Sequence, residues 1–170
     1  MIKQGCDALQ SKSRLSKGKS SSKTLHKVKQ PKKTTVKKRA WDAFSKFIRT
    51  RDCIRTTGCP DWGLCITCQK RYHIKLLQAG HFIAGRHNAN LFNEKGCHSQ
   101  CYNCNVNLRS NPLEYRRQII KLYGEGYDEV LEKESKEIKK YSVQDLTEIC
   151  EKYKMKLRGL LNESISKDNN

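Results

Sequence analysis

The ten residues GCHSQCYNCN, Gly96–Asn105, contain three cysteines and one histidine. Cys101 and Cys104 form a CxxC pair, and a second pair, Cys65 and Cys68, precedes them with 32 residues in between. Each CxxC turn can direct two thiolates at one ion, and two such turns complete a tetrahedral Zn²⁺ shell with no open position. The spacing therefore predicts a structural four-cysteine zinc site whose binding energy contributes to folding.

Other interpretations of the cysteines are redox-active dithiols and a chance spacing. Cys53, Cys59 and Cys97 are possible substitute ligands, but each lacks a CxxC partner and fits a buried small hydrophobe or a free thiol. The chain has nine cysteines, and an odd number fits an extracellular disulfide framework poorly. Clustered cysteines in a reducing compartment more often bind metal, so we expect zinc and a cytoplasmic protein.

The segment between the two CxxC pairs is longer than the insert of a single-helix zinc finger. It has room for a β-hairpin held between the two cysteine pairs, and it includes His81, His87 and His98. Within it, the run NLFNEKG, residues 90–96, predicts a short strand that ends in a turn.

Apolar residues at helical spacing predict helices on both sides of this region. Over Ala40–Asp52 they line one face and leave basic side chains elsewhere, and Cys53–Gly63 follows as a loop. Asn111 and Pro112 are typical of a helix start, with Asn111 as the cap, and Gly124 ends that helix.

Two further helices are expected after Gly124. One covers about Tyr127–Lys139, and the other opens at Ser142 and continues with apolar residues at helical spacing to Leu161. The expected organisation is a disordered basic arm over residues 1–39, a zinc-bound core over 40–124, a helical region over 125–162 and a frayed tail over 163–170.

The basic excess is concentrated at the start of the chain. Residues 1–39 carry 13 lysines and arginines against one acid, whereas residues 124–170 carry 9 against 11. A net charge of +18 favours a polyanionic partner, because cations that neutralise phosphates release condensed counterions. Solubility alone is the plainer explanation. No stretch is apolar over the length that a membrane span requires, so we expect no membrane partner.

A resemblance is carried by several separated motifs in order: FIRTRD, CITC, AGHF, LFNEKGCHSQCYNCN, SNPLEYR and VQDLTEICEKYKMKLRGL. Over about Trp41–Leu161 they resemble the NinG family, also called Rap, of lambdoid-phage recombination endonucleases. A histidine at a strand end, then a loop and a strand running into CxxCN, is also similar to HNH nucleases. This implies an α+β fold: a zinc-stabilised, HNH-like ββα-metal core, treble-clef-like, with flanking helices.

The same resemblance implies a metal-dependent DNA endonuclease that cuts branched recombination intermediates such as D-loops and Holliday junctions. By motif matching, His81 takes the place of the base that activates water. His98 and Asn105 match positions that could hold a catalytic Mg²⁺ or Mn²⁺ ion. The alternative roles are packing within the hairpin for His81 and a contact near the zinc for His98.

This chain departs from the family pattern at four places, one of which is the run Asn107–Arg109, where family members tend to carry a basic or imidazole side chain after the CN pair. Gln78 stands where the family has aspartate, and Gly80 stands where HNH proteins carry a metal ligand before the histidine. Gly96 occupies the place of a central asparagine, for which Asn93 is a candidate after a one-residue shift.

Phosphate contacts are expected from arginines with no obvious base-reading set, which favours recognition of DNA shape over sequence. They are Arg49, Arg51, Arg55, Arg71, Arg86, Arg109, Arg116 and Arg117. Paired cuts across a junction would favour a homodimer, and recombination proteins are further possible partners. A non-catalytic, zinc-dependent DNA-binding recombination accessory protein is the competing function, and zinc-dependent RNA binding is a third.

Overall fold

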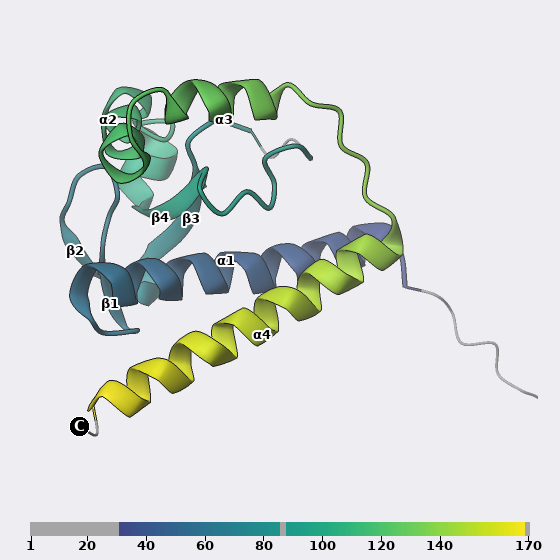
Figure 1. Cartoon of the computed structure of the whole chain (residues 1–170), viewed down its shortest axis with the longest axis horizontal. Helices are drawn as coiled ribbons and strands as arrows, with labels where there is room; N and C mark the ends of the chain where they lie inside the picture. The colour runs from purple at the N-terminus through teal and green to yellow at the C-terminus, as the bar shows by residue number, and fades with distance from the viewer. Residues whose placement is uncertain (1–30, 86–87, 169–170) are drawn as a thin grey trace, which may run out of the picture. The chain divides into compact units, whose positions relative to one another are not determined.

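The computed structural model of this chain describes residues 31–85 and 88–168, and the statements below concern those residues. The elements are α1 (Lys33–Thr57), β1 (Trp62–Leu64), β2 (Arg71–His73), η1 (Ile74–Leu76), β3 (Leu77–His81), β4 (Cys97–Cys101), η2 (Asn103–Asn107), α2 (Pro112–Tyr123), α3 (Tyr127–Ser135) and α4 (Val143–Asp168) (Figure 1). This mixture of helices and small sheets confirms the expected α+β class.

The strands form two antiparallel pairs, β1 with β2 and β3 with β4. In the second pair Gly80 lies opposite His98, and His81 lies opposite Cys97. Side chains alternate between the two faces along a strand, so His81 and His98 project from opposite faces. The expected hairpin between the cysteine pairs is therefore present, and its first strand ends at His81.

The second strand of the hairpin lies later in the chain than expected. Residues 90–96 form turns, and the strand is Cys97–Cys101. The Asn93 side chain explains the turn, because its Oδ1 accepts hydrogen bonds from the backbone amides of Lys95 at 3.0 Å and Gly96 at 3.1 Å. Asparagine side chains that bond nearby backbone in this way favour turns over strands.

The helix α1 is longer at both ends than the periodicity predicted. It begins at Lys33 instead of Ala40 and continues to Thr57, through residues expected to be a loop. Val36 explains the earlier start, because it is 5% exposed and packs with Tyr141 and Leu146, which follow it by more than a hundred residues. Residues 1–30 of the expected basic arm lie outside the described residues.

The main core forms where α4 packs against α1 and the hairpin (Figure 1). Ring centroids of Phe44 and Phe47 lie 4.9 Å and 5.3 Å from that of Tyr153. Ala79 and Cys97 complete this cluster from β3 and β4. Burying a phenylalanine side chain contributes about 1.5–3 kcal/mol, so these contacts fix the hairpin face that carries His81 against α1.

The helix α2 begins and ends as predicted, but its start has a different cause. The Asn111 side chain makes no capping hydrogen bond, and its φ angle is 46°. Gly124 ends the helix by donating its backbone N–H to the Ile120 carbonyl. Tyr115 and Ile119 are fully buried and pack α2 into a second cluster with Phe82 and Leu131.

The helix α4 opens as predicted. The backbone N–H of Ser142 donates to the Asp145 carboxylate at 2.8 Å, and that of Asp145 donates to the Ser142 hydroxyl at 3.0 Å. Its far end continues to Asp168, where fraying was expected from residue 163, and α3 ends at Ser135, short of the expected Lys139. None of the helices in residues 31–85 and 88–168 is long and apolar enough to cross a membrane.

Candidate functional site

The four cysteines of the two CxxC pairs meet in space. Their Sγ atoms all lie within 4.8 Å of one another, and those of Cys68 and Cys101 are 3.9 Å apart. Zn–S bonds of about 2.3 Å in a tetrahedron place sulfurs about 3.8 Å apart, so this arrangement fits Zn²⁺. Cys65 and Cys68 come from the turn after β1, Cys101 ends β4, and Cys104 lies in η2.

Four thiolates at this spacing would repel one another. Burial raises the pKa of Cys65, but hydrogen bonds from Thr67 and from backbone amides outweigh it and lower that pKa to about 7. Burial and neighbouring sulfurs raise the pKa of Cys104 to about 12. Four thiolates therefore coexist here only when a metal ion compensates their repulsion.

The other described cysteines take no part in this cluster. Cys53 is fully buried, and burial raises the pKa of its thiol to about 12. A Cβ on Gly63 would lie 2.6 Å from the Cys53 sulfur, so Gly63 lets β1 approach α1 closely. Cys97 belongs to the aromatic core with Phe44. Within residues 31–85 and 88–168, the four predicted cysteines are the only cluster of at least three histidine, cysteine or acidic side chains placed to share an ion.

His81 lies at the end of β3 with 7% of its surface exposed. Its ring stacks on Trp41 of α1, with centroids 5.3 Å apart and an interplanar angle of 24°. Its Nε2 lies 3.3 Å from the Leu91 carbonyl oxygen. Because a carbonyl can only accept, this hydrogen bond places the proton on Nε2 and leaves the lone pair of the neutral ring on Nδ1.

Asn105 follows Cys104 in η2 and approaches the hairpin from the other side. Its Nδ2 donates to Oε1 of Gln78 at 2.7 Å, which orients the carboxamide. His81 and Asn105 both line a hollow of about 440 Å³. The lining residues are Ala79, His81, Ala84, Gly85, Asn105, Val106, Arg109 and Ser110.

His98 does not reach this hollow, so the structure does not bring it together with His81 and Asn105. It is fully buried on the opposite face of the hairpin. Its Nδ1 lies 3.2 Å from the Asp52 carboxylate and its Nε2 lies 3.2 Å from the Tyr123 hydroxyl. These protein partners occupy both ring nitrogens, and the expected metal ligand is placed in the interior.

Asp52 is the buried charged residue that the sequence patterns did not single out. Burial raises its pKa, but contacts with His98, Arg51 and Arg55 outweigh burial and hold the pKa well below its ordinary value. Burial also lowers the pKa of His98, and the attraction of Asp52 opposes this only in part. The carboxylate further accepts the backbone N–H of Ser99 at 2.7 Å, which ties α1 to β4.

The glycine before His81 is required by packing. A Cβ on Gly80 would lie 2.1 Å from Oε1 of Gln100 and 2.9 Å from Oδ1 of Asn105. Gln100 is fully buried, and its Nε2 donates to the Ser110 carbonyl at 2.9 Å. The absence of a side chain at Gly80 therefore leaves room for the Gln100 side chain.

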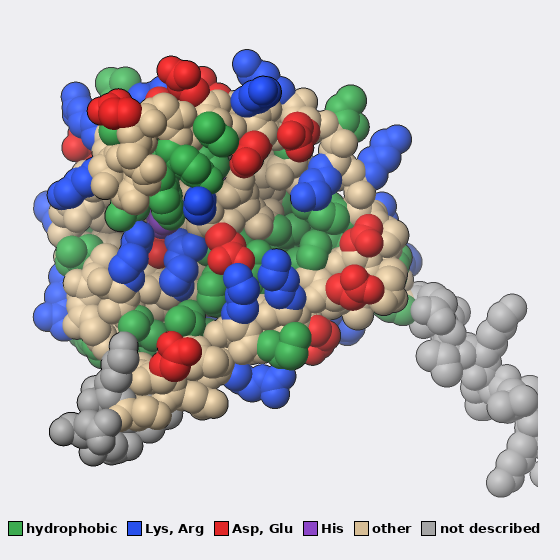
Figure 2. All heavy atoms as spheres, viewed as in Figure 1, with side chains coloured by type: hydrophobic (Ala, Val, Ile, Leu, Met, Phe, Trp, Pro, Cys, Tyr) green, Lys and Arg blue, Asp and Glu red, His purple; other side chains and the backbone are tan. Residues whose placement is uncertain are grey.

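Several of the expected DNA-contacting arginines have partners within the protein. Arg51 donates to the carbonyls of Glu94 at 2.8 Å and Cys97 at 3.0 Å. Arg49 donates to the Ile74 carbonyl, and Arg55 pairs with Asp52 at 3.2 Å. On the face drawn in Figure 2, basic and acidic side chains are interspersed and do not form one basic field.

The remaining expected arginines differ in their partners. Arg116 pairs with Asp128 and Glu132, and Arg117 pairs with Glu114. Arg71 lies over the Trp62 ring, 5.3 Å from its centroid. In the described part of the chain Arg109 makes no side-chain hydrogen bond or ion pair, and it lines the hollow with His81. Arg86 lies outside the described residues.

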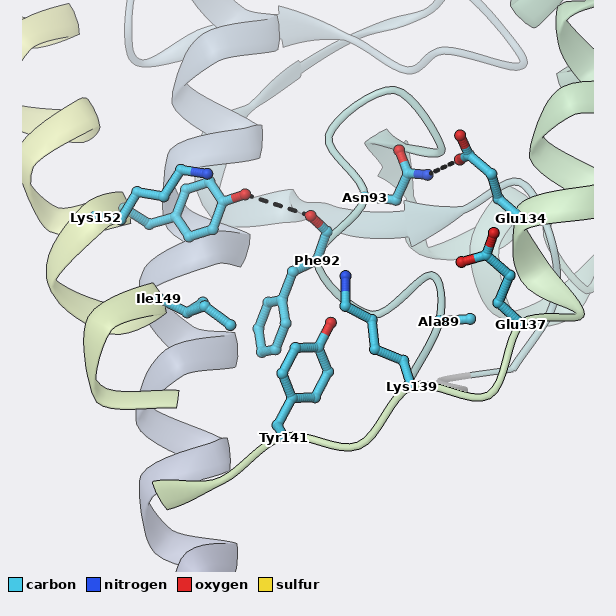
Figure 3. A pocket seen from close by; sticks show the side chains of 10 residues that line it. Ala89, Phe92, Asn93, Glu134, Glu137, Lys139, Tyr141, Ile149 and Lys152 are labelled. Atoms are coloured by element: carbon cyan, nitrogen blue, oxygen red, sulfur yellow. Dashed lines mark hydrogen bonds between the residues drawn. The ribbon is translucent and has the colours of Figure 1, made fainter. Parts of the chain in front are cut away.

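A second hollow, of about 360 Å³, lies between α4, the segment before it and the turns before β4 (Figure 3). Phe92 and Tyr141 form its aromatic side, and Glu134 accepts a hydrogen bond from Asn93 at 2.8 Å. Of the residues that the resemblance singled out, only Asn93, the candidate for the central asparagine, lines this hollow.

Comparison with known proteins identifies relatives of this chain. Residues 2–163 match the family described as Bacteriophage Lambda NinG protein. Protein ninG of Escherichia phage 933W is 31% identical over 127 residues, which cover 74% of this chain and 58% of that protein. Protein ninG of Escherichia phage lambda is 30% identical over 127 residues, which cover 74% and 57%.

The chain spans a little under three fifths of the length of these relatives. No solved structure matches it. The match over nearly the whole sequence, together with the four-cysteine cluster, confirms the resemblance that the separated motifs indicated. This chain belongs to the NinG family of bacteriophage proteins.

Proposed function

We propose that this chain is a metal-dependent endonuclease that cuts branched DNA, such as D-loops and Holliday junctions, during phage recombination. The observation that carries the proposal is the convergence of His81 and Asn105 on one hollow. His81 ends the first strand of the β-hairpin. Asn105 lies in the short helix η2 that follows the hairpin and contains Cys104, one of the four clustered cysteines. This order of elements supports the proposal of an HNH-like, ββα-metal core.

In the proposed reaction, His81 accepts a proton from the attacking water. An imidazole has an unperturbed pKa near 6.5, so it is largely neutral at pH 7 and can act as a base. Stacking on Trp41 and the contact with the Leu91 carbonyl fix the ring orientation. The neutral lone pair then belongs to Nδ1, which is the atom that would take the proton.

Asn105 would offer its Oδ1 to a divalent ion, because its Nδ2 already donates to Gln78. Mg²⁺ or Mn²⁺ at this position would neutralise the phosphate and assist the departing oxygen. Mg²⁺ commonly retains several waters and binds substrate phosphates, so water and phosphate would supply the rest of its ligands. We leave His98 out of this set because it is fully buried, with its two ring nitrogens against Asp52 and Tyr123.

A synthetic four-way junction and a plasmid D-loop, each incubated with Mg²⁺ or Mn²⁺, test the proposal. The unmodified protein is expected to nick near the branch point, and His81→Ala to cut at least about 100-fold more slowly, the range of general-base effects. His73→Ala, a histidine of β2 away from the hollow, should cut like the unmodified protein. Tight binding without nicks by the unmodified protein would contradict the proposal.

One observation favours a second function, a DNA-binding recombination accessory without nuclease activity. No carboxylate is among the described residues that line the hollow, and Gln78 stands where the family has aspartate. This function predicts that the unmodified protein and His81→Ala bind junctions equally at fixed salt, and that neither cuts them.

A further inference from the structure

Three consecutive residues after η2 adopt left-handed backbone conformations. The φ angles of Arg109, Ser110 and Asn111 are 48°, 71° and 46°, and none of the three is a glycine. Residues with a Cβ rarely take positive φ angles, and they persist in them only where surrounding structure fixes the backbone. Three such residues in a row beside the candidate site therefore require a structural cause, and their position suggests a role in the site.

The cause is the fully buried side chain of Gln100. Its Nε2 donates to the Ser110 carbonyl at 2.9 Å and lies 3.3 Å from the Thr67 hydroxyl. The Ser110 N–H donates to the Asn105 carbonyl at 3.0 Å, so the turn is held on both of its polar groups. Gly80 provides the space in which the Gln100 side chain lies. Gln100 of β4 therefore holds the turn, and Gly80 of β3 leaves room for it.

The consequence is the position of Arg109. Its side chain is exposed and lines the hollow that His81 and Asn105 also line. The other arginines near the fold core are committed to carbonyls or carboxylates, as Arg51 and Arg116 show. Arg109 alone among the hollow's described lining residues carries a positive charge, and no described carboxylate pairs with it.

We propose that Arg109 binds the non-bridging oxygens of the scissile phosphate and that the left-handed turn is the device that positions it. This inference rests on the proposed nuclease function and deepens it. A guanidinium presents a planar pair of donors that matches two phosphate oxygens, and it keeps its charge at any working pH. In a hollow whose described lining has no carboxylate, this cation stabilises the negative charge that grows on phosphorus oxygens during attack.

The first test measures single-turnover cleavage and dissociation constants on the same four-way junction with Mn²⁺. Arg109→Gln is expected to lower the cleavage rate about 100-fold, the usual effect of removing a preorganised donor to a developing charge. Affinity should fall by less than about 3-fold, because one phosphate contact among several is lost. Arg109→Lys keeps the positive charge but loses the planar pair of donors, so it should recover part of the cleavage rate.

Arg158→Gln is the matched control, since Arg158 is an exposed residue of α4 and loses the same charge. It should leave the rate unchanged. Equal rates for Arg109→Gln and Arg158→Gln, in a protein that does cut, would overturn the role of Arg109 and leave the nuclease function standing. A protein that binds junctions but never cuts them would overturn both.

The second test separates the turn from the side chain through Asn111. Its side chain makes no capping hydrogen bond, so its backbone angle is what the turn uses. Asn111→Gly accepts a positive φ and should cut like the unmodified protein, whereas Asn111→Val resists it and should cut at least about 10-fold more slowly. Zinc content and the circular dichroism spectrum should match between the two. Equal rates for both variants would show that the turn does not position Arg109.

Discussion

The carboxylate of Asp52 and the imidazole of His98 lie 3.2 Å apart in the interior, one on α1 and the other on β4. The contact joins the long helix to the hairpin at a point away from the hollow that contains His81. It helps to hold His98 in the interior, and the burial of that imidazole, which lowers its pKa, gives the folded state a dependence on pH.

Stability should decrease as the pH falls below about 6.5. The pKa of His98 is lowered in the folded state, so the unfolded chain takes up the proton first. The stabilisation is complete above the unfolded pKa and is lost as the pH falls toward the folded one. The pKa of Asp52 is also lowered, so its share is lost only below about 3.9. Urea unfolding midpoints at pH 7.5, 6.5 and 5.5 measure this decrease.

His98→Asn provides the control for that pH dependence. The variant should be less stable at pH 7.5 because Asp52 loses a partner, and it should lose less stability than the parent between pH 6.5 and 5.5. Zinc content is measured at each pH, since protonated thiols release metal. Identical slopes for parent and variant at constant zinc would assign the dependence to another group.

Removal of zinc should unfold the protein. Structural zinc sites contribute about 10–16 kcal/mol, which is comparable with or larger than the total stability of a typical domain. We expect one Zn²⁺ per chain, and loss of the helical circular dichroism signal when a strong chelator removes it. Cys68→Ser should bind zinc weakly and unfold easily, whereas Cys59→Ser, outside the cluster, should behave like the parent. A chain that stays folded without metal would contradict the structural role.

Gly80→Ala should destabilise the hairpin. The new Cβ would lie 2.1 Å from Oε1 of the buried Gln100, which cannot move without releasing its bond to Ser110. Overpacking of this kind costs about 1–3 kcal/mol, seen as a lower urea midpoint. Gly159→Ala in α4 is the matched control, because nothing lies within 4 Å of its Cβ. Alanine there should stabilise the helix by up to about 1 kcal/mol; a neutral Gly80→Ala would show that Gln100 is free to shift.

Arg51→Ala should lower stability more than it lowers DNA affinity. The side chain is 20% exposed, and its loss removes one of the cationic partners of the Asp52 carboxylate and the guanidinium donor to the Glu94 and Cys97 carbonyls. Breaking such a buried pair costs about 3–5 kcal/mol. Arg71→Ala should have the opposite effect, with stability retained and the salt dependence of junction binding reduced by about one phosphate contact. Thermal unfolding and salt-dependent gel shifts measure the two quantities, and a stable Arg51→Ala with weak binding would contradict this division.

Local spacing was sufficient to predict several features. The two CxxC turns predicted the metal cluster because two residues between cysteines fix where both thiolates point, whatever surrounds them. Ser142 and Asp145 predicted the start of α4 because a capping box bonds only to its own backbone. The ordered motifs also indicated the NinG family, which the comparison confirms.

Other features depend on which surfaces meet. The side of the hairpin that His98 faces, and its burial against Asp52, follow from the packing of β4 against α1, a contact between distant segments. The start of α1 at Lys33 depends on Val36 meeting Tyr141 of the segment before α4. The left-handed turn after η2 could not be predicted from a glycine, because it contains none. The buried amide of Gln100, on another strand, imposes it.

The sequence by itself therefore determined the four clustered cysteines, most helix positions and the family, since each rests on chemistry within a few residues or on ordered motifs. Only the tertiary structure decided which histidine lines the hollow and which arginines are left for a phosphate. Burial and pairing of a charge are set by the groups that surround it in space, and those groups come from elements far apart in the chain.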